Sequence, residues 1–324
     1  MGDPAGIGPE IIVKALIGGQ LDPYLDQIRV AGDVQILVRA ALLFGIEARW
    51  LGETSELSCG QRRLKVAPLS RLSEAEVPFG QLRAENGRAM LNYIEWACEQ
   101  CRTGKALAMV TAPIHKEAIH AAGCVFPGHT ELLAQRCGVE RVVMMLGGPR
   151  LNVCLVTTHL ALRRVPQQLT FDEILQTIRI TNDAFQRYFC RDRKPKIAVL
   201  ALNPHAGEGG LFGDEERVTI GPAIEQARAE GIEASGPHSA DTLFYFAANG
   251  GYDAVVCMYH DQGLIPLKLL HFEDGVNVTL GLPIIRTSVD HGTAYDQAGK
   301  GTASAQSLVA AVKMAVRMAN NHNA

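Results

Sequence analysis

Apolar and polar positions along the chain follow two patterns. Short aliphatic runs with β-branched members predict buried strands, and longer stretches with apolar positions three or four residues apart predict amphipathic helices. Alternation of the two is typical of an α/β protein with a mainly parallel sheet covered by helices. The predicted strands lie at residues 106–113, 141–148, 151–159, 196–203, 252–260 and 275–283.

Helical periodicity is clearest at residues 115–123, 172–189, 221–232 and 304–320. Residues 56–80 are loop-rich, and their pattern predicts no regular element. The chain has no internal repeat and no Pro- or Ser-rich linker, so two subdomains that share a cleft are favoured over two tethered domains.

Composition and charge exclude several classes of protein. The 324 residues carry a formal net charge of −3, without the basic surface that nucleic acids and anionic membranes attract. The chain has no apolar run long enough to span a bilayer, and MGDPAGIGPE lacks the features of a signal peptide. Of eight scattered cysteines, only Cys98 and Cys101 form a C-x-x-C, and we interpret them as buried thiols. A cytoplasmic protein is expected.

Three histidines follow three predicted strands. His159 ends NVCLVTTH, His205 follows IAVLALNP, and His260 ends AVVCMYH. Ligands of open α/β sheets bind beyond the carboxyl ends of the strands, so the three imidazoles can converge there. Three neutral nitrogen ligands suit a catalytic divalent metal. Zinc fits best, and magnesium, cobalt, nickel and manganese are alternatives. The competing interpretation makes each histidine an individual capping or core residue.

Two carboxylates lie near these strand ends. Asp241 and Asp261 can orient a metal-bound imidazole or transfer a proton. A helix N-cap or a turn former explains either residue equally well.

Cations that can hold an anionic substrate are Lys116, Lys268 and Arg286. Arginine suits a bidentate grip on phosphate or carboxylate, and lysine a point contact. His129 and Thr130, in PGHTE, can add donors to the same anion.

Glycine-rich segments give no nucleotide fingerprint by themselves. MGDPAGIGPEIIVKAL predicts a tight turn that opens a helix, which is a common anion-binding geometry. It does not match G-x-G-x-x-G, and AGKGT near residue 300 fails the phosphate-loop pattern. Motif spacing alone therefore identifies no dinucleotide site.

Taken together, eight segments resemble the 4-hydroxythreonine-4-phosphate dehydrogenase family of vitamin B6 biosynthesis. In chain order they are GDPAGIGPE, TAPIHKEAI, PGHTELL, TTHLALR, LNPHAGEGG, ADTLF, YHDQGLIPLK and VNVTLGLPIIRTSVDHGTA. The resemblance implies the isocitrate/isopropylmalate dehydrogenase-like fold: two α/β/α subdomains with mainly parallel sheets and an active-site cleft between them. It implies a nucleotide-side domain of residues 1–128 and 285–324, and a metal, substrate and dimerisation domain of residues 129–284.

The resemblance also implies site residues. The family's metal ligands fall on His159, His205 and His260. Its substrate contacts fall on His129, Thr130, Lys268, Asn277 and Arg286. DHGTAYDQAGKGTAS is similar to the adenine-side loop with which the wider superfamily binds NAD, and this similarity marks His291, Gly292, Thr293 and Asp296. Asp241 and Lys116 are the candidates for proton transfer.

The implied reaction is metal-dependent, NAD- or NADP-linked oxidation of 4-phosphohydroxy-L-threonine. The product is a β-keto acid that loses CO₂ to give 3-amino-2-oxopropyl phosphate, in pyridoxal 5′-phosphate biosynthesis. A homodimer with the active site near the subunit interface is implied. Family members usually carry a short strand before MGDPAGIGPE, and its absence is expected to weaken the N-terminal layer.

Other functions remain open from the sequence. Related enzymes oxidise 4-phospho-D-threonate, 4-phospho-D-erythronate or a terephthalate cis-dihydrodiol. The histidine before Lys116 and the segment RTSVDHGTA favour the B6 enzymes. A three-histidine metal hydrolase and a non-catalytic ligand-binding protein are further alternatives, but neither explains the NAD-type loop.

Overall fold

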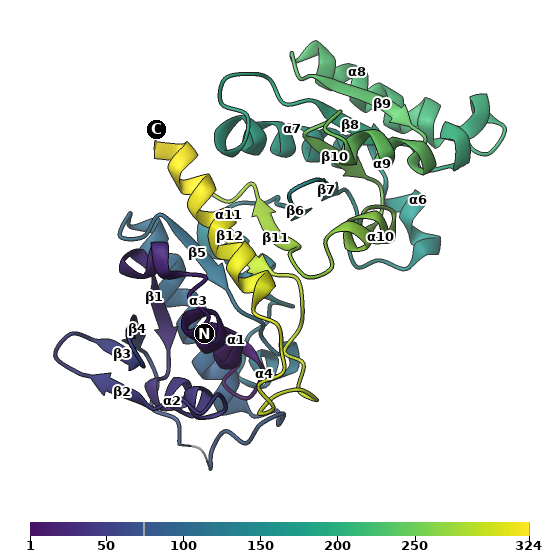
Figure 1. Ribbon diagram of the computed structural model, residues 1–324. Coiled ribbons are helices and arrows are strands. Elements are labelled where there is room, and N and C mark those ends of the chain that lie inside the picture. The colour runs from purple at the N-terminus through teal and green to yellow at the C-terminus, as the bar shows by residue number, and fades with distance from the viewer. Residues whose placement is uncertain (74, 324) are drawn as a thin grey trace. The chain divides into compact units, whose positions relative to one another are not determined.

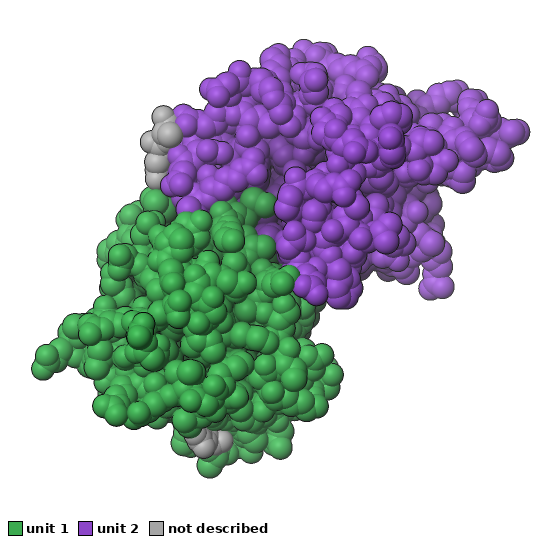
Figure 2. Space-filling view, in the orientation of Figure 1, with its two compact units in different colours: residues 1–138, 283–315 green, residues 139–282, 316–324 purple. Residues whose placement is uncertain are grey.

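The computed structural model describes residues 1–73 and 75–323, which form two compact units. The first unit comprises Met1–Gly138 and Pro283–Ala315, and the second comprises Val139–Leu282 and Val316–Ala324 (Figure 2). Among the described residues, no helix combines the length and the apolar character needed to cross a membrane.

The boundaries of the units differ from the predicted ones. The structure keeps helix α5 (His129–Cys137) with the first unit, because α5 packs on α3 (Ala84–Arg102) and Arg136 pairs with Glu95 across that contact. The last turns of the C-terminal helix belong to the second unit, where Asn321 donates a hydrogen bond to the Tyr188 carbonyl oxygen.

The first unit contains two groups of strands (Figure 1). In the four-stranded sheet β1-β4-β3-β2, β1 and β4 are parallel and the other neighbours antiparallel, while β5 and β12 form a parallel pair. The strands are β1 (Arg29–Gly32), β2 (Ala48–Leu51), β3 (Glu56–Cys59), β4 (Arg62–Pro68), β5 (Ala108–Thr111) and β12 (Ile285–Val289). The helices are α1 (Gly8–Ile17), η1 (Asp22–Gln27), α2 (Val34–Leu42), α3, α4 (Lys116–Ala121), α5 and most of α11 (Gln306–Asn323).

The segment at residues 56–80, which predicted no element, contains the hairpin β3–β4. Leu57, Leu64 and Val66 are buried on one face, with polar and charged residues between them, and Gly60 supplies the positive φ (58°) of the turn. The alternation is short and interrupted by arginine and serine, so it gave no clear strand signal in the sequence.

In the second unit, strands hydrogen-bond in the order β11-β6-β7-β10-β8-β9. β7, β10, β8 and β9 run parallel, whereas β11, β6 and β7 are antiparallel neighbours. The strands are β6 (Val143–Gly147), β7 (Asn152–Leu155), β8 (Ile197–Leu200), β9 (Ala234–His238), β10 (Ala254–Cys257) and β11 (Val276–Leu280). The helices are η2 (Leu162–Arg164), α6 (Val165–Gln168), α7 (Phe171–Tyr188), η3 (Pro204–Gly210), η4 (Glu216–Ile220), α8 (Gly221–Ala229), α9 (Ala240–Ala248) and α10 (His260–Leu270).

These elements confirm the predicted α/β class with mainly parallel strands. The apolar runs form β5, β6, β7, β8, β10 and β11, each close to its predicted position. Side chains of the central strands build the core of the second unit, in which Val153, Leu200 and Val255 are buried together with Leu267 of α10.

Gly87 allows a close contact between α3 and α4 in the first unit. A Cβ at this position would lie 1.9 Å from the carbonyl oxygen of Ala118 in α4. Gly87→Ala is therefore expected to lower the free energy of unfolding by about 2 kcal/mol, despite the better helix propensity of alanine. Urea unfolding measures this change, and Asn92→Ala on the exposed face of the same helix should stay within about 0.5 kcal/mol of the parent. An unchanged unfolding midpoint in Gly87→Ala would contradict this packing.

Candidate functional site

The second unit brings the carboxyl ends of three neighbouring parallel strands to one edge of its sheet. β10 pairs in parallel with β7 on one side and with β8 on the other. His159 follows β7, His205 follows β8, and His260 follows β10. His260 is the first residue of α10 rather than the last residue of a strand, because β10 ends at Cys257. The three histidines therefore follow adjacent strands at this edge of the sheet.

Gln262 locks two of these strand ends together, and nothing in the sequence pattern singled it out beyond its place in YHDQG. Its buried side chain accepts a hydrogen bond from the Met258 amide and donates one to the Ala201 carbonyl oxygen, both at 2.7 Å. Thr157 ties the third strand end to the same place, since its hydroxyl donates to the Met258 carbonyl oxygen at 2.7 Å. These hydrogen bonds thus hold together the three strand ends that precede the histidines.

The rings of two of the predicted metal ligands lie close to each other. The ring centroids of His159 and His260 are 5.5 Å apart, close to the separation of about 5 Å expected for two imidazoles on one tetrahedral metal. Nδ1 of His260 lies 2.7 Å from Oδ1 of Asp261, which leaves Nε2 available to a metal. Within residues 1–73 and 75–323, however, no three His, Cys, Asp or Glu side chains lie close enough to hold an ion, so His205 is not grouped with the other two.

Asp241 lies in the first turn of α9, where Ser239 Oγ donates a hydrogen bond of 2.6 Å to its carboxylate. This hydrogen bond holds the pKa of Asp241 below its usual value. The N-cap of α9 is Ser239 and not Asp241, whose exposed carboxylate lies in the first turn, where a negative charge interacts favourably with the helix dipole. This carboxylate is also suited to accept a proton rather than to donate one.

In the first unit, Arg286 and His129 form a candidate anion site. Arg286 on β12 is 3% exposed, and its Nε and Nη2 donate to the hydroxyl of Thr111 at 3.1 and 2.8 Å. Burial lowers the pKa of Arg286 to about 10, and Glu131 partly offsets this effect. Burial and the positive charge of Arg286 lower the pKa of His129 well below its usual value, so its imidazole is neutral near pH 7. A buried guanidinium beside a neutral donor suits phosphate or carboxylate.

Thr111 was missed in the sequence, although it lies within the predicted strand 106–113 and is the last residue of β5. Lys116 begins α4, and its Cε lies 3.8 Å from the position that a Cβ on Gly128 would occupy, next to the start of α5. Thr130 is the second residue of α5 and is half-buried. His129, Arg286, Lys116 and Thr130 therefore all belong to the first unit.

Two of the predicted substrate contacts belong to the second unit. Lys268 lies in the last turn of α10, with its Nζ 5.7 Å from the centroid of the Phe272 ring. Asn277 lies on β11, where it pairs with Leu146 of β6. The predicted substrate residues are thus divided between the two units.

The N-terminal turn holds the loop that follows β12. The Ile7 amide donates to the Thr293 carbonyl oxygen at 3.1 Å, and the Tyr295 hydroxyl donates to Asp3 Oδ2 at 2.7 Å. The ring of His115 stacks on Tyr295 with the centroids 4.7 Å apart. Residues at opposite ends of the sequence therefore build this loop together.

Two side chains of α1 extend this support. Buried Glu10 accepts hydrogen bonds from the Gly299 and Gly301 amides, the latter at 3.0 Å, and Lys14 Nζ donates to the Ala303 carbonyl oxygen at 2.7 Å. The turn GDPAGIGPE was expected to offer an anion-binding helix start. Its own carboxylate, Glu10, lies in the first turn instead. There its negative charge interacts favourably with the helix dipole, and its hydrogen bonds hold the loop.

The predicted nucleotide residues play different parts in this loop. Nδ1 of His291 lies 3.1 Å from the Gly292 carbonyl oxygen, and its Nε2 is buried without a hydrogen-bond partner in the described part of the chain. Gly292 has open space on its side-chain face, and Asp296 is exposed. An unsatisfied ring nitrogen beside open backbone fits a ligand-binding loop, whereas buried Thr293 anchors the loop to the N-terminal turn.

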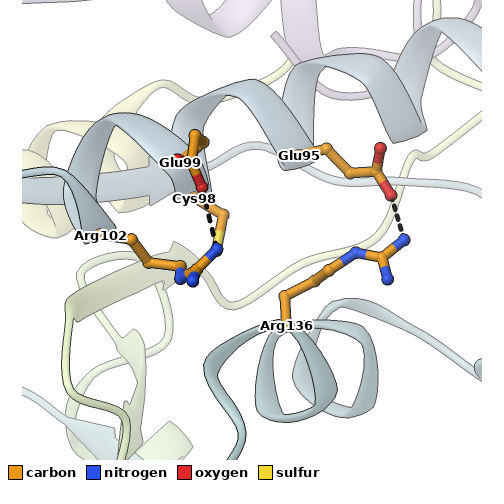
Figure 3. Close-up of a pocket in the computed structure, with 5 residues that line it drawn as sticks. All are labelled: Glu95, Cys98, Glu99, Arg102 and Arg136. Carbon is orange, nitrogen blue, oxygen red and sulfur yellow. Dashed lines mark hydrogen bonds and ion pairs between the residues drawn. The ribbon is translucent and has the colours of Figure 1, made fainter.

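A pocket between α3 and α5 is not a comparable site. Figure 3 shows that it is lined by Cys98 and by two ion pairs, Glu95–Arg136 and Glu99–Arg102. The ion pairs satisfy the charges, and burial raises the pKa of Cys98 to about 12, which disfavours the reactive thiolate. Of the C-x-x-C pair, Cys98 is the expected buried thiol, whereas Cys101 is partly exposed.

Comparison with known proteins confirms the resemblance. The family model "Pyridoxal phosphate biosynthetic protein PdxA" matches residues 25–315. A 4-hydroxythreonine-4-phosphate dehydrogenase of Geobacter metallireducens is 57% identical, with 98% of this chain and 94% of the relative covered. A putative D-threonate 4-phosphate dehydrogenase of Bradyrhizobium diazoefficiens is 45% identical, with 98% and 95% covered. The crystal structure of 4-hydroxythreonine-4-phosphate dehydrogenase from Klebsiella pneumoniae has a TM-score of 0.87 at 40% identity, with 98% of each chain covered. The chain therefore belongs to the PdxA family of pyridoxal phosphate biosynthetic proteins and is an oxidoreductase of the dehydrogenase type.

Proposed function

We propose that this protein oxidises the secondary alcohol of 4-phosphohydroxy-L-threonine with NAD or NADP. Hydride leaves the alcohol carbon for the nicotinamide and the hydroxyl proton is lost, which gives a β-keto acid. Breakage of its carboxyl C–C bond then releases CO₂, and protonation of the carbon gives 3-amino-2-oxopropyl phosphate. The observation that carries the proposal is the succession of three histidines after three adjacent parallel strands.

His159, His205 and His260 would hold a divalent metal, with zinc favoured over magnesium, cobalt, nickel and manganese. Such a metal supplies Lewis acidity that lowers the pKa of the substrate alcohol. Asp261 would orient the His260 ring through its hydrogen bond to Nδ1.

Arg286 would bind the anionic substrate, assisted by His129 and Thr130 of the same unit. Lys268 and Asn277 are the candidate substrate contacts of the second unit. The desolvated guanidinium favours this role for Arg286, because an arriving anion relieves the cost of its burial. Lys116 and Asp241 are the candidates for proton transfer. Asp241 would act as the acceptor because it is ionised near pH 7, although its lowered pKa makes it a weaker base than an ordinary aspartate.

The loop with His291, Gly292, Thr293 and Asp296 would bind the dinucleotide. Its support is the unsatisfied Nε2 of His291 and the dense set of hydrogen bonds from Asp3, Glu10 and Lys14. A loop held this firmly is preorganised for a ligand.

A cytoplasmic homodimer with its active site near the interface is also proposed. The second unit exposes many large apolar side chains on the stretches of chain around His205 and His260. They are Leu211, Phe212, Val218, Tyr245, Phe246, Ile265, Leu269 and Phe272. Exposed apolar side chains in such number favour a protein partner, and light scattering after gel filtration should give twice the mass of one chain.

A second candidate substrate is 4-phospho-D-threonate, favoured by the similarity to the Bradyrhizobium protein. The deciding assay follows NADH absorbance with each substrate, using protein loaded with metal. NADH should form with 4-phosphohydroxy-L-threonine, and a chelator or His205→Ala should abolish it. Preference for 4-phospho-D-threonate would move the protein to that activity. No NADH with either substrate, from protein that binds metal and NAD, would exclude both, and failure to bind NAD would favour a metal hydrolase.

A further inference from the structure

The loop that carries His205 has an unusual backbone. Five consecutive residues, from His205 to Gly209, have φ between 44° and 79°. Three of them, His205, Ala206 and Glu208, are not glycine, and side chains of L residues disfavour this left-handed region. Such strain persists only where the surrounding structure holds it, and it is concentrated at functional sites.

Glu216 holds this loop at its base. The side chain is buried, and its Oε1 accepts hydrogen bonds from the amides of Leu202 and Asn203, both at 2.8 Å. Its Oε2 accepts a third, at 3.0 Å, from the side-chain amide of Asn203. One carboxylate therefore fixes the chain between the end of β8 and His205.

Gly207 brings the top of the loop against the same carboxylate. A Cβ on Gly207 would lie 2.6 Å from Oε2 of Glu216. Gly209 has a similar φ, 69° against 79°, but has nothing within 4 Å of its side-chain position. The loop thus closes onto Glu216 at Gly207 and not at Gly209.

We propose that Glu216 is a positioning residue that sets the orientation of His205 for metal binding. The inference rests on the proposed metal site, to which it adds a residue that does not itself touch the ion. It explains why a strained left-handed turn occurs at this histidine: the turn directs the side chain, and the buried carboxylate keeps the turn in place.

Glu216→Gln tests the proposal most directly. A glutamine can keep the acceptor at Oε1, but its NH₂ would face the NH₂ of Asn203. Asn203 cannot rotate its amide without losing its second hydrogen bond, to Glu215 at 2.7 Å. The affinity for Zn²⁺ alone, measured by competition with a chromophoric chelator, should fall about 10- to 100-fold. Glu215→Gln, which removes the charge beside the same amide but leaves the backbone anchored, should change the Zn²⁺ affinity by less than about threefold.

A double-mutant cycle separates positioning from general loss of stability. In the His205→Ala background, Glu216→Gln should cause no further loss of Zn²⁺ affinity, because the oriented ligand is already absent. An equal loss in both backgrounds would overturn the proposal.

A glycine pair provides a second test that does not depend on Glu216→Gln folding. In Gly207→Ala, the added methyl group would displace the Glu216 carboxylate, and Zn²⁺ binding should weaken at least about tenfold. Gly209→Ala carries the same backbone penalty without that contact, and its Zn²⁺ affinity should stay within about threefold of the parent's. Equal effects of the two substitutions would contradict the proposed role.

Amide hydrogen exchange separates this inference from the proposed function. In metal-free Glu216→Gln, exchange at residues 202–210 should rise at least about tenfold over the parent. If it does not, the anchor is refuted whether or not metal binds. If it rises but the parent binds no Zn²⁺, the loop anchor stands and the proposed metal site fails.

Discussion

His260→Ala is expected to lower kcat/KM for NADH formation by about 10³-fold or more. The proposed site would lose one of three ligands, and the Lewis acidity that the metal supplies contributes several kcal/mol to the barrier. Stability should change little, because His260 is only half-buried and it contacts neighbouring Asp261 and the His159 ring. Steady-state kinetics, metal analysis of the dialysed protein and thermal unfolding measure the three quantities.

Two further variants make the result specific. His120→Ala removes an exposed histidine of α4 with no assigned role and should leave kcat/KM within about twofold. Asp261→Asn keeps the ligand but weakens its orientation, and should reduce metal affinity about 10- to 100-fold. If His260→Ala retained both its metal and its activity, the assignment of His260 as a ligand would be wrong.

Arg286→Met is expected to raise KM for the phosphorylated substrate at least about 100-fold, with a smaller effect on KM for NAD. Loss of a charge-assisted, bidentate contact with an anion accounts for about 3 kcal/mol. The free energy of unfolding should not fall by more than about 1 kcal/mol. The lowered pKa of Arg286, about 10 against 12.5, corresponds to an unfavourable burial of charge of about 3 kcal/mol, which the methionine removes.

The comparison that checks this uses Arg88→Met, in which an exposed arginine of α3 loses its ion pair with Glu85. Neither KM nor stability should change appreciably in that variant. If Arg286→Met bound the substrate as tightly as the parent, the anion would have to bind elsewhere. If it unfolded at much lower temperature, Arg286 would be a structural residue whose contact with Thr111 stabilises the fold.

The sequence determined the class of fold and the edge of the sheet at which the three histidines follow their strands. Runs such as 196–203 and 252–260 are apolar on both faces, which identifies strands buried between helices, and the helices between them in the chain favour parallel neighbours. Residues placed directly after such strands must lie at one edge of the sheet. Local patterns therefore sufficed to select His159, His205 and His260 before their strands were known to be adjacent.

Only the tertiary structure decided how that edge and the nucleotide-type loop are held. Asp3 meets Tyr295 and Glu10 meets Gly301 across almost the whole length of the chain, and no local pattern encodes such contacts. The left-handed turn at His205 depends on the buried carboxylate of Glu216, because a sequence of mostly non-glycine residues would not adopt it alone. Propensity and periodicity report interactions within a few residues, whereas buried carboxylates acquire their roles from partners that only folding brings near.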